Sequence, residues 1–151
     1  MKALTNYLIL CCALACLLAA CSGGDENKKT ADDFKAKSSD MSPLELKMAE
    51  GKKVYDKTCL ACHQANGNGV DGAFPPLAKS DFFAGDKLKL VSNIVNGIKG
   101  EITVNGKKYN TEMPKQPVSD EEAASVATYV LNSFGNSGGE VTVEEVLSVK
   151  K

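Results

Sequence analysis

The sequence predicts an all-α domain that carries one small β-hairpin. Three segments have the apolar spacing of amphipathic helices, and two of these begin with residues that form a capping box. One Asn-Gly pair, Asn105-Gly106, lies between short runs of strand-forming residues. The chain has 151 residues, of which 43% are hydrophobic and 25% charged, a composition typical of one globular domain.

The first helix is expected to begin at Ser42 and Pro43 and to run to about Thr58. Ser42 is suited to cap the helix, and proline is favoured at the first helical position. Gly51 lies in the middle of this segment, where glycine is unfavourable by about 1 kcal/mol relative to alanine. A close crossing by another helix would explain the glycine.

Two further helices are predicted later in the chain. One covers residues 86–96, with Gly97 as its C-terminal stop. The other begins at Ser119, where Glu122 completes a capping box, and its apolar stripe ends at Gly135. The stripe consists of Ala123, Val126, Ala127, Val130, Leu131 and Phe134.

Between these two helices, the Asn105-Gly106 pair predicts a hairpin over residues 102–109. Residues 136–139 are typical of a linker. Residues 142–150 are compatible with a short terminal helix or a strand, and the sequence does not decide between the two.

An export signal is predicted over residues 1–20. Lys2 supplies a positive end, and an apolar run follows that is marginal for a membrane span of about 20 residues. A permanent anchor helix is the alternative. The sequence Leu18-Ala19-Ala20-Cys21 resembles a bacterial lipobox, which implies that Cys21 is the acylated first residue of the mature protein and anchors it to a membrane.

The residues after Cys21 are almost entirely polar and charged, so they bury too little apolar surface to fold. The predicted organisation is therefore a signal over 1–20, a lipidated flexible tether over 21–41, a folded domain over 42–135 and a C-terminal extension over 136–151. The lipid anchor implies a location on the periplasmic or extracytoplasmic side of a bacterial membrane.

The charges argue against a nucleic-acid-binding protein. There are 18 basic and 19 acidic residues, giving a net charge of -1, so no basic field surrounds the chain. All the basic residues are lysines. Any anionic group must therefore be held without a guanidinium.

The motif Cys59-x-x-Cys62-His63 matches the signature for covalent attachment of a c-type haem. At the end of a helix, two thiols at this spacing reach the two vinyl groups, and the adjacent imidazole reaches the iron from the same side. Zinc needs four ligands, more than the mature chain offers once Cys21 is acylated. A thioredoxin-like pair needs a βαβ context, and a structural disulfide leaves His63 unexplained.

His63 is the only histidine, so the sixth iron ligand must be a methionine, another side chain or nothing. Met48 lies on the helix that leads to the motif, where a core role is expected, and Met41 lies in the tether. Met113, in a loop before the third helix, is placed to fold over the far face of the haem.

Several motifs between residues 43 and 150 combine into one pattern. They are Tyr55-x-x-x-Cys59-x-x-Cys62-His63-Gln64, Gly67-x-Gly69, Phe74-Pro75-Pro76-Leu77, Tyr109-x-x-x-Met113-Pro114, and Ser119-Asp120-x-Glu122 leading to Thr128-Tyr129-Val130. Together they resemble a class I, monohaem cytochrome c. The pattern is most similar to the small monohaem domains found free or fused to periplasmic oxidoreductases such as copper nitrite reductases.

The resemblance implies a cytochrome c fold, in which the first and last helices cross around one covalent haem c and the hairpin precedes an axial Met113. Gly51 and Tyr55 would then meet the surface over residues 127–131. The resemblance also implies that the Pro75 carbonyl accepts the Nδ1 proton of His63. Leu77 is implied to pack on the haem. The candidate propionate partners are Tyr109, Lys79 and Lys108.

By the same resemblance, the protein is expected to transfer electrons and not to be an enzyme, because His63 and Met113 would close the iron to substrates. It would act as a monomeric domain that carries one electron between respiratory redox partners, which the sequence does not name. The alternative is a haem-based gas sensor or peroxidase-like enzyme in which Met113 dissociates, although no distal histidine or arginine is available. A tethered subunit of a larger reductase or oxidase is compatible with electron transfer.

Overall fold

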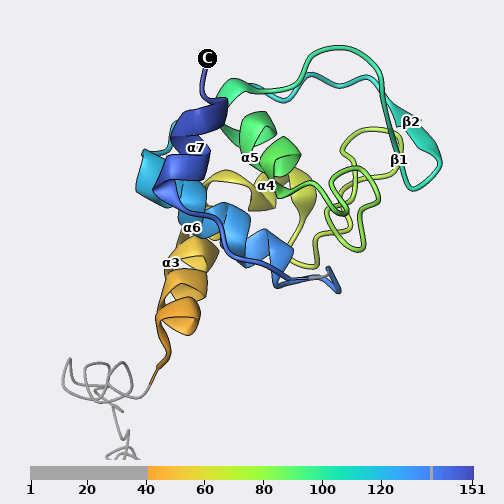
Figure 1. Ribbon diagram of the computed structural model, residues 1–151. Coiled ribbons are helices and arrows are strands. Elements are labelled where there is room, and N and C mark those ends of the chain that lie inside the picture. The colour runs from red at the N-terminus through yellow and green to blue at the C-terminus, as the bar shows by residue number, and fades with distance from the viewer. Residues whose placement is uncertain (1–40, 137) are drawn as a thin grey trace, which may run out of the picture. The chain divides into compact units, whose positions relative to one another are not determined.

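The computed structural model describes residues 41–136 and 138–151. The predicted signal, Cys21 and all but the last residue of the tether lie outside the described residues. The elements are α3 (Pro43–Thr58), α4 (Leu60–His63), α5 (Lys87–Asn96), β1 (Ile102–Val104), β2 (Lys107–Tyr109), α6 (Asp120–Leu131) and α7 (Val143–Val149), as Figure 1 shows. This part of the chain contains no helix that is long and apolar enough to cross a membrane.

Helices α3 and α6 cross at Gly51 (Figure 1). A Cβ atom on Gly51 would overlap the Ser125 carbonyl oxygen and stand 2.7 Å from Tyr129 Cβ, so only glycine permits this approach. One turn later, the buried ring of Tyr55 lies 5.5 Å from the Tyr129 ring. The predicted close crossing is confirmed, and it begins at Ser125, slightly before the surface over 127–131 that the family resemblance implies.

Side chains cap the predicted helix starts. Ser42 with Glu45 and Ser119 with Glu122 form complete capping boxes on α3 and α6. Helix α5 begins one residue inside the predicted range, because Asp86 is its cap, and it ends before the expected glycine stop. The predicted starts of these helices are confirmed to within one residue. The sequence could locate them because the capping signals lie within four residues of each helix start.

Helix α6 ends at Leu131, earlier than its apolar stripe predicts. The Asn132 side-chain amide donates to the last turn of the helix and to the Gly139 carbonyl at 2.6 Å, which turns the chain back along the helix. Phe134 therefore lies beyond the helix with φ of 59°, and its ring lies 5.3 Å from the Tyr55 ring. The prediction that the stripe continues to Phe134 as helix is wrong.

The predicted hairpin is confirmed as the antiparallel pair β1 and β2. Asn105 and Gly106 both have positive φ angles, 49° and 77°, as a type I′ turn requires. The hairpin is anchored at its tip, where the Asn105 N–H donates to the Asp81 carboxylate at 2.6 Å. Its buried side chains are Val104 and Tyr109.

The segment after residue 136 packs against the helices. Helix α7 contacts α5 and α6 (Figure 1), and Val141 and Val146 are fully buried. Thr142 and Glu145 form a third capping box. The segment whose form the sequence left open is therefore a helix, and it belongs to the same compact unit as α3 to α6.

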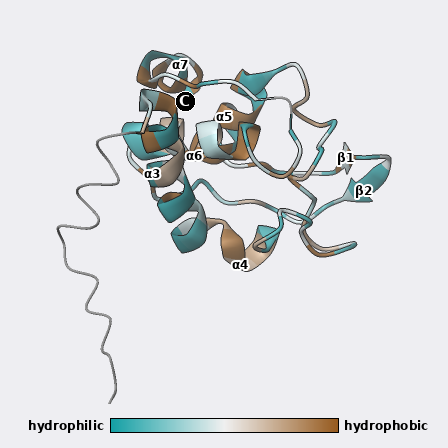
Figure 2. Ribbon diagram, turned by 90° about the horizontal axis from the view of Figure 1, so that it is seen from below, coloured by the Kyte–Doolittle hydropathy of each residue, from teal (hydrophilic) through white to brown (hydrophobic). Residues whose placement is uncertain are grey.

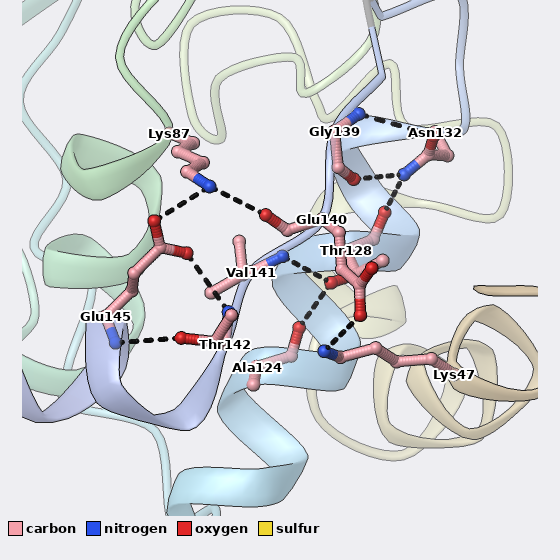
Figure 3. A network of polar contacts seen from close by, with 10 residues as sticks. All are labelled: Lys47, Lys87, Ala124, Thr128, Asn132, Gly139, Glu140, Val141, Thr142 and Glu145. Carbon is pink, nitrogen blue, oxygen red and sulfur yellow. Dashed lines mark hydrogen bonds and ion pairs between the residues drawn. The ribbon is translucent and has the colours of Figure 1, made fainter. Parts of the chain in front are cut away.

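A polar network fixes this segment (Figure 3). The buried Thr128 hydroxyl donates to the carbonyl one turn earlier and accepts from the Val141 N–H at 3.0 Å. The Lys87 ammonium donates to the Glu140 carbonyl at 2.8 Å, and Lys47 pairs with the Glu140 carboxylate at 2.9 Å. One short stretch of chain thus binds α3, α5 and α6 together.

The apolar core lies among α3, α5, α6 and α7. Its buried members are Val54, Tyr55, Phe83, Leu90, Val91, Ile94, Val95, Ala123, Ala124, Val126, Ala127, Val130, Leu131, Val141 and Val146. Figure 2 shows hydrophobic residues on α5, whereas β2 is mostly hydrophilic. The motif that follows α3 is therefore attached directly to a helix of this core.

Candidate functional site

The Cys59-x-x-Cys62-His63 motif occupies a single helical turn directly after α3. Cys59 is both the C-cap of α3 and the N-cap of α4. Its carbonyl accepts hydrogen bonds from the N–H groups of Cys62 at 3.2 Å and His63 at 2.9 Å. Residues three and four apart lie on one face of a helix. The turn therefore presents both sulfurs and the imidazole on the same side, and the two thiols are free and partly buried.

Helix α4 ends at His63, and the next residue, Gln64, has an unusual backbone conformation with φ of 63°. The Gln64 carbonyl accepts a hydrogen bond from the buried Tyr55 hydroxyl at 2.7 Å. Burial raises the pKa of Tyr55, so this hydroxyl stays protonated and remains a donor. The bond ties the end of the motif to the crossing of α3 and α6.

The imidazole of His63 is buried, with 8% of the residue exposed. Its Nδ1 atom lies 3.0 Å from the Pro75 carbonyl oxygen, the pairing that the resemblance implies. Because a carbonyl oxygen only accepts, Nδ1 carries the proton and Nε2 is left as the ligand atom. Burial lowers the pKa of His63 and the bond to Pro75 offsets this only in part, which favours the neutral ring, the form that binds a metal.

We call residues 59–78 the proximal wall. Within it, the Gly67 carbonyl accepts from the Leu77 N–H at 2.7 Å, which closes the loop after the motif. Gly69 has φ of 64°, and a Cβ atom there would stand 2.6 Å from the Pro75 carbonyl oxygen. The loop therefore lies in close contact with the Pro75 carbonyl that orients His63, and only glycine fits at position 69.

We call residues 97–116 the distal wall. It consists of the chain after α5, the hairpin and the loop that holds Met113. One largely apolar cavity separates the two walls, and it is lined by Thr58, Cys59, Cys62, His63, Phe74, Pro75, Ile98, Ile102, Thr111, Glu112, Met113, Pro114 and Gln116. The structure therefore brings Met113 to the same cavity as the cysteine and histidine motif.

The side chains around this cavity fit a covalently attached haem. Two sulfurs on one helical turn, a neutral imidazole and a thioether converge on a mostly apolar space. Imidazole and thioether groups are both axial ligands of c-type haem. In the described part of the chain, no group of three or more His, Cys, Asp and Glu side chains is arranged to hold a metal ion directly.

Other residues considered from the sequence do not line this cavity. Leu77 packs, partly buried, against the helical core, and Met48 lies half-buried in α3. Of the candidate propionate partners, Tyr109 is buried in β2, Lys108 forms an exposed ion pair, and the Lys79 side chain lies beside the turn at residue 135.

The structure adds two residues that the sequence analysis did not connect with the site. Gly97, expected only as a helix stop, also lies against the Met113 loop, where a Cβ atom would stand 2.6 Å from the Met113 carbonyl oxygen. Ile98 forms an isolated antiparallel bridge with Met113. The spacing of apolar residues in the sequence does not predict such a bridge, because the bridge joins two loops and not two strands.

The relatives of this chain include small cytochromes and a cytochrome subunit. Cytochrome c-552 of Thermus thermophilus is 38% identical over 99 residues, 62% of this chain and 66% of that protein. Cytochrome c-551 of Bacillus subtilis is 30% identical over 130 residues, 86% of this chain and 96% of that protein. The fructose dehydrogenase cytochrome subunit of Gluconobacter japonicus is 30% identical over 69% of this chain, which corresponds to 22% of that protein.

The family model for cytochrome c matches residues 48–134, which include most of α3, all of α4 to α6 and both walls of the cavity. The match and the geometry agree on the cofactor, because Cys59 and Cys62 have the typical attachment spacing. The chain therefore belongs to the cytochrome c family, and its cofactor is covalently attached haem c.

Proposed function

We propose that this protein is an electron carrier in which His63 and Met113 are the two axial ligands of the haem iron. One observation carries the proposal, namely that Met113 and the Cys59-x-x-Cys62-His63 motif line the same cavity. When bound, the haem supplies an iron that takes up and releases one electron. Two ligands from the chain leave no position for a substrate, which favours a carrier over an enzyme.

The residues of the cavity have separate roles in this proposal. Cys59 and Cys62 attach the cofactor, and His63 binds the iron through Nε2 while Pro75 fixes the ring. The Met113 thioether stabilises reduced iron and so raises the reduction potential. Apolar side chains of the distal wall exclude water, which also disfavours the more highly charged ferric state.

Replacing Met113 tests the ligation. Wild-type ferric protein is expected to show the near-infrared Met–iron band, and its ferrous form to exclude CO. Met113→Ala should lose the band, bind CO and lower the potential on the order of 0.1 V, within the roughly 0.8 V range that axial ligands span. Optical redox titration of the holoprotein measures all three.

Met48→Ala is the matched control, because Met48 lies half-buried in α3 and does not line the cavity. It should cost about 1–3 kcal/mol of stability while leaving the band and the potential in place. If wild-type protein lacks the band, or binds CO readily when reduced, the carrier proposal fails. A gas sensor or peroxidase-like enzyme with a displaceable ligand then replaces it.

We also propose that acylated Cys21 anchors the protein to the extracytoplasmic face of a bacterial membrane through the tether over residues 21–41. The lipobox-like sequence that ends at Cys21 supports this. Cys21→Ala should yield soluble or uncleaved protein in cell fractionation. A processed Cys21→Ala protein that still fractionates with membranes would contradict the anchor.

The partners proposed are redox proteins of the same membrane. The similarity to a protein named as a fructose dehydrogenase cytochrome subunit supports a role beside a larger oxidoreductase. A tethered haem domain suits such a role, because tethering raises the effective concentration of the domain near its partners.

A further inference from the structure

Helix α5 ends in a corner, Gly97-Ile98, that carries the loop of Met113. The Ile98 N–H donates to the Met113 carbonyl at 2.8 Å, and the Met113 N–H donates to the Ile98 carbonyl at 3.0 Å. Three residues later, the Gln116 N–H donates to the Ile94 carbonyl at 3.0 Å. Both backbone groups of Met113 are therefore bonded to the corner that follows α5, and the end of its loop is bonded to the last turn of the helix.

Gly97 sets how closely the loop approaches the helix. Its backbone, with φ of 80° and ψ of 178°, lies in a region that is almost restricted to glycine. A Cβ atom there would stand 2.6 Å from the Met113 carbonyl oxygen and 2.8 Å from the Lys115 nitrogen. Both contacts are with backbone atoms, so a side chain at Gly97 must push the whole loop away.

The loop itself is short and braced. Pro114 restricts the backbone next to Met113. The Gln116 side-chain amide donates to the Pro114 carbonyl at 2.7 Å, which closes the turn. The helix that holds this loop is rigid in turn, because Leu90 and Ile94 of α5 are buried in the core.

Among the described residues, no side chain makes a hydrogen bond to the Met113 sulfur, whereas His63 is oriented by the Pro75 carbonyl. The position of the thioether therefore depends on its own backbone. We propose that the Gly97-Ile98 corner positions Met113 at the iron and holds its loop closed. This inference rests on the proposed function, in which Met113 is an axial ligand.

The test is Gly97→Ala in the complete holoprotein. The displaced loop should lose most of the near-infrared Met–iron band of the ferric protein, and the ferrous protein should bind CO. Covalent haem and the far-ultraviolet circular dichroism of the helices should be retained. Gly100→Ala is the matched control, because Gly100 also has a positive φ, 88°, but nothing lies within 4 Å of its Cβ position.

The outcomes separate the inference from the proposed function. If wild-type protein lacks the band, Met113 is not a ligand and the proposed function itself fails. If wild-type protein has the band and Gly97→Ala keeps it in full and excludes CO, the corner does not position Met113. Equal losses in Gly97→Ala and Gly100→Ala would also overturn the inference, because backbone strain and not the contact would then be the cause.

If Gly97→Ala does not accumulate as folded holoprotein, a second variant tests whether the loop of Met113 must be held closed. Gln116→Ala removes the side-chain bond to Pro114 but leaves the backbone in place, and its ferrous form should bind CO, which wild-type protein excludes. Gln64→Ala is its control, because that side chain makes a similar bond to the Ala61 carbonyl at 3.2 Å on the proximal wall. Exclusion of CO by Gln116→Ala, as by wild-type protein and Gln64→Ala, would overturn the inference.

Discussion

The proximal wall of the cavity is bonded to residues from the beginning and the end of the domain, whereas the distal wall is bonded to the last turn of α5 and, at the hairpin tip, to Asp81. On the proximal side, Tyr55 of α3 donates to the Gln64 carbonyl at 2.7 Å, and the Asn136 side chain donates to the Leu77 carbonyl at 3.0 Å. These bonds come from the beginning and from the end of the domain. These hydrogen bonds therefore join the proximal wall to the structural unit that contains the crossing of α3 and α6.

On the distal side, the backbone pairing of Ile98 with Met113 is the central contact. The side-chain contacts there include the ion pair of Lys99 with Glu112, in which 84% and 57% of the side chains are exposed. Ion pairs this exposed contribute little to stability. Within the distal wall, the backbone pairing of Ile98 with Met113 is therefore the contact that holds the Met113 loop.

The two walls therefore differ in what holds them in place. The histidine side is fixed by the packing that folds the protein, so changes there should cost stability. The methionine side is fixed by local backbone pairing, so changes there should alter ligation while the fold survives. Substitutions in the proximal wall and at its ion pair with β2 should therefore change the free energy of unfolding by different amounts.

Gly69→Ala should have the largest effect on stability. The new methyl group meets the Pro75 carbonyl, and alanine is strained at φ of 64°. Together, strain and overpacking should lower the free energy of unfolding of the holoprotein by about 3 kcal/mol. Urea titration followed by circular dichroism measures this loss.

The control for this variant is Gly72→Ala in the same loop. Gly72 has φ of 72°, but nothing lies within 4 Å of its Cβ position, so only the strain of about 1 kcal/mol is expected. Equal losses in the two variants would show that the contact with Pro75 does not support the proximal wall.

Tyr55→Phe should have an intermediate effect. It removes the hydroxyl that donates to the Gln64 carbonyl while keeping the ring in place. A partly buried carbonyl that loses its donor should cost about 1–2 kcal/mol in the free energy of unfolding. Tyr129→Phe is the control, because Tyr129 lies in the same ring cluster and its hydroxyl makes no hydrogen bond within residues 41–136 and 138–151. A loss as large in the control would contradict the role of the Gln64 bond.

The smallest effect is expected where an exposed ion pair joins the two walls. Asp71 of the proximal wall and Lys107 of β2 lie 2.8 Å apart, and hydrogen bonding to Lys107 lowers the pKa of Asp71 below its ordinary value of 3.8. A carboxyl whose pKa is lowered by folding stabilises the protein above its unfolded pKa, and this contribution disappears as the pH falls through the lowered value.

Asp71→Asn should therefore reduce stability slightly at neutral pH and not at all in strong acid. Urea titrations of wild-type protein and the variant across this range measure the difference. In a Lys107→Ala background the same substitution should have no effect at any pH. A difference that grows towards acid pH would contradict the assignment.

Much of this fold follows from short stretches of sequence. The capping boxes at Ser42 and Ser119 and the Asn105-Gly106 turn depend on neighbours within a few residues, so the sequence alone locates them. The Cys59-x-x-Cys62-His63 motif is equally local, because one helical turn brings its three side chains to one face. From these residues the sequence predicts both the cofactor and the wall that attaches it.

The sequence also predicts correctly that Gly51 lies at a helix crossing, because a glycine inside a good helix needs a tertiary reason. It does not predict that α6 ends at Leu131. That end depends on the Asn132 side chain bonding to Gly139, which lies beyond the helix. Apolar periodicity continues past the point where the backbone leaves the helix.

Only the tertiary structure decides how the two walls meet. The bond between His63 and Pro75, the bridge between Ile98 and Met113, and the packing of α7 all join residues that local patterns treat as independent. Helix signals act over three or four residues, whereas these contacts form only after the chain has collapsed around a shared core. Local sequence therefore predicts the helices, the hairpin, the haem-attachment motif and the candidate Met113, whereas the contacts that hold the Met113 loop at the cavity form only in the folded chain.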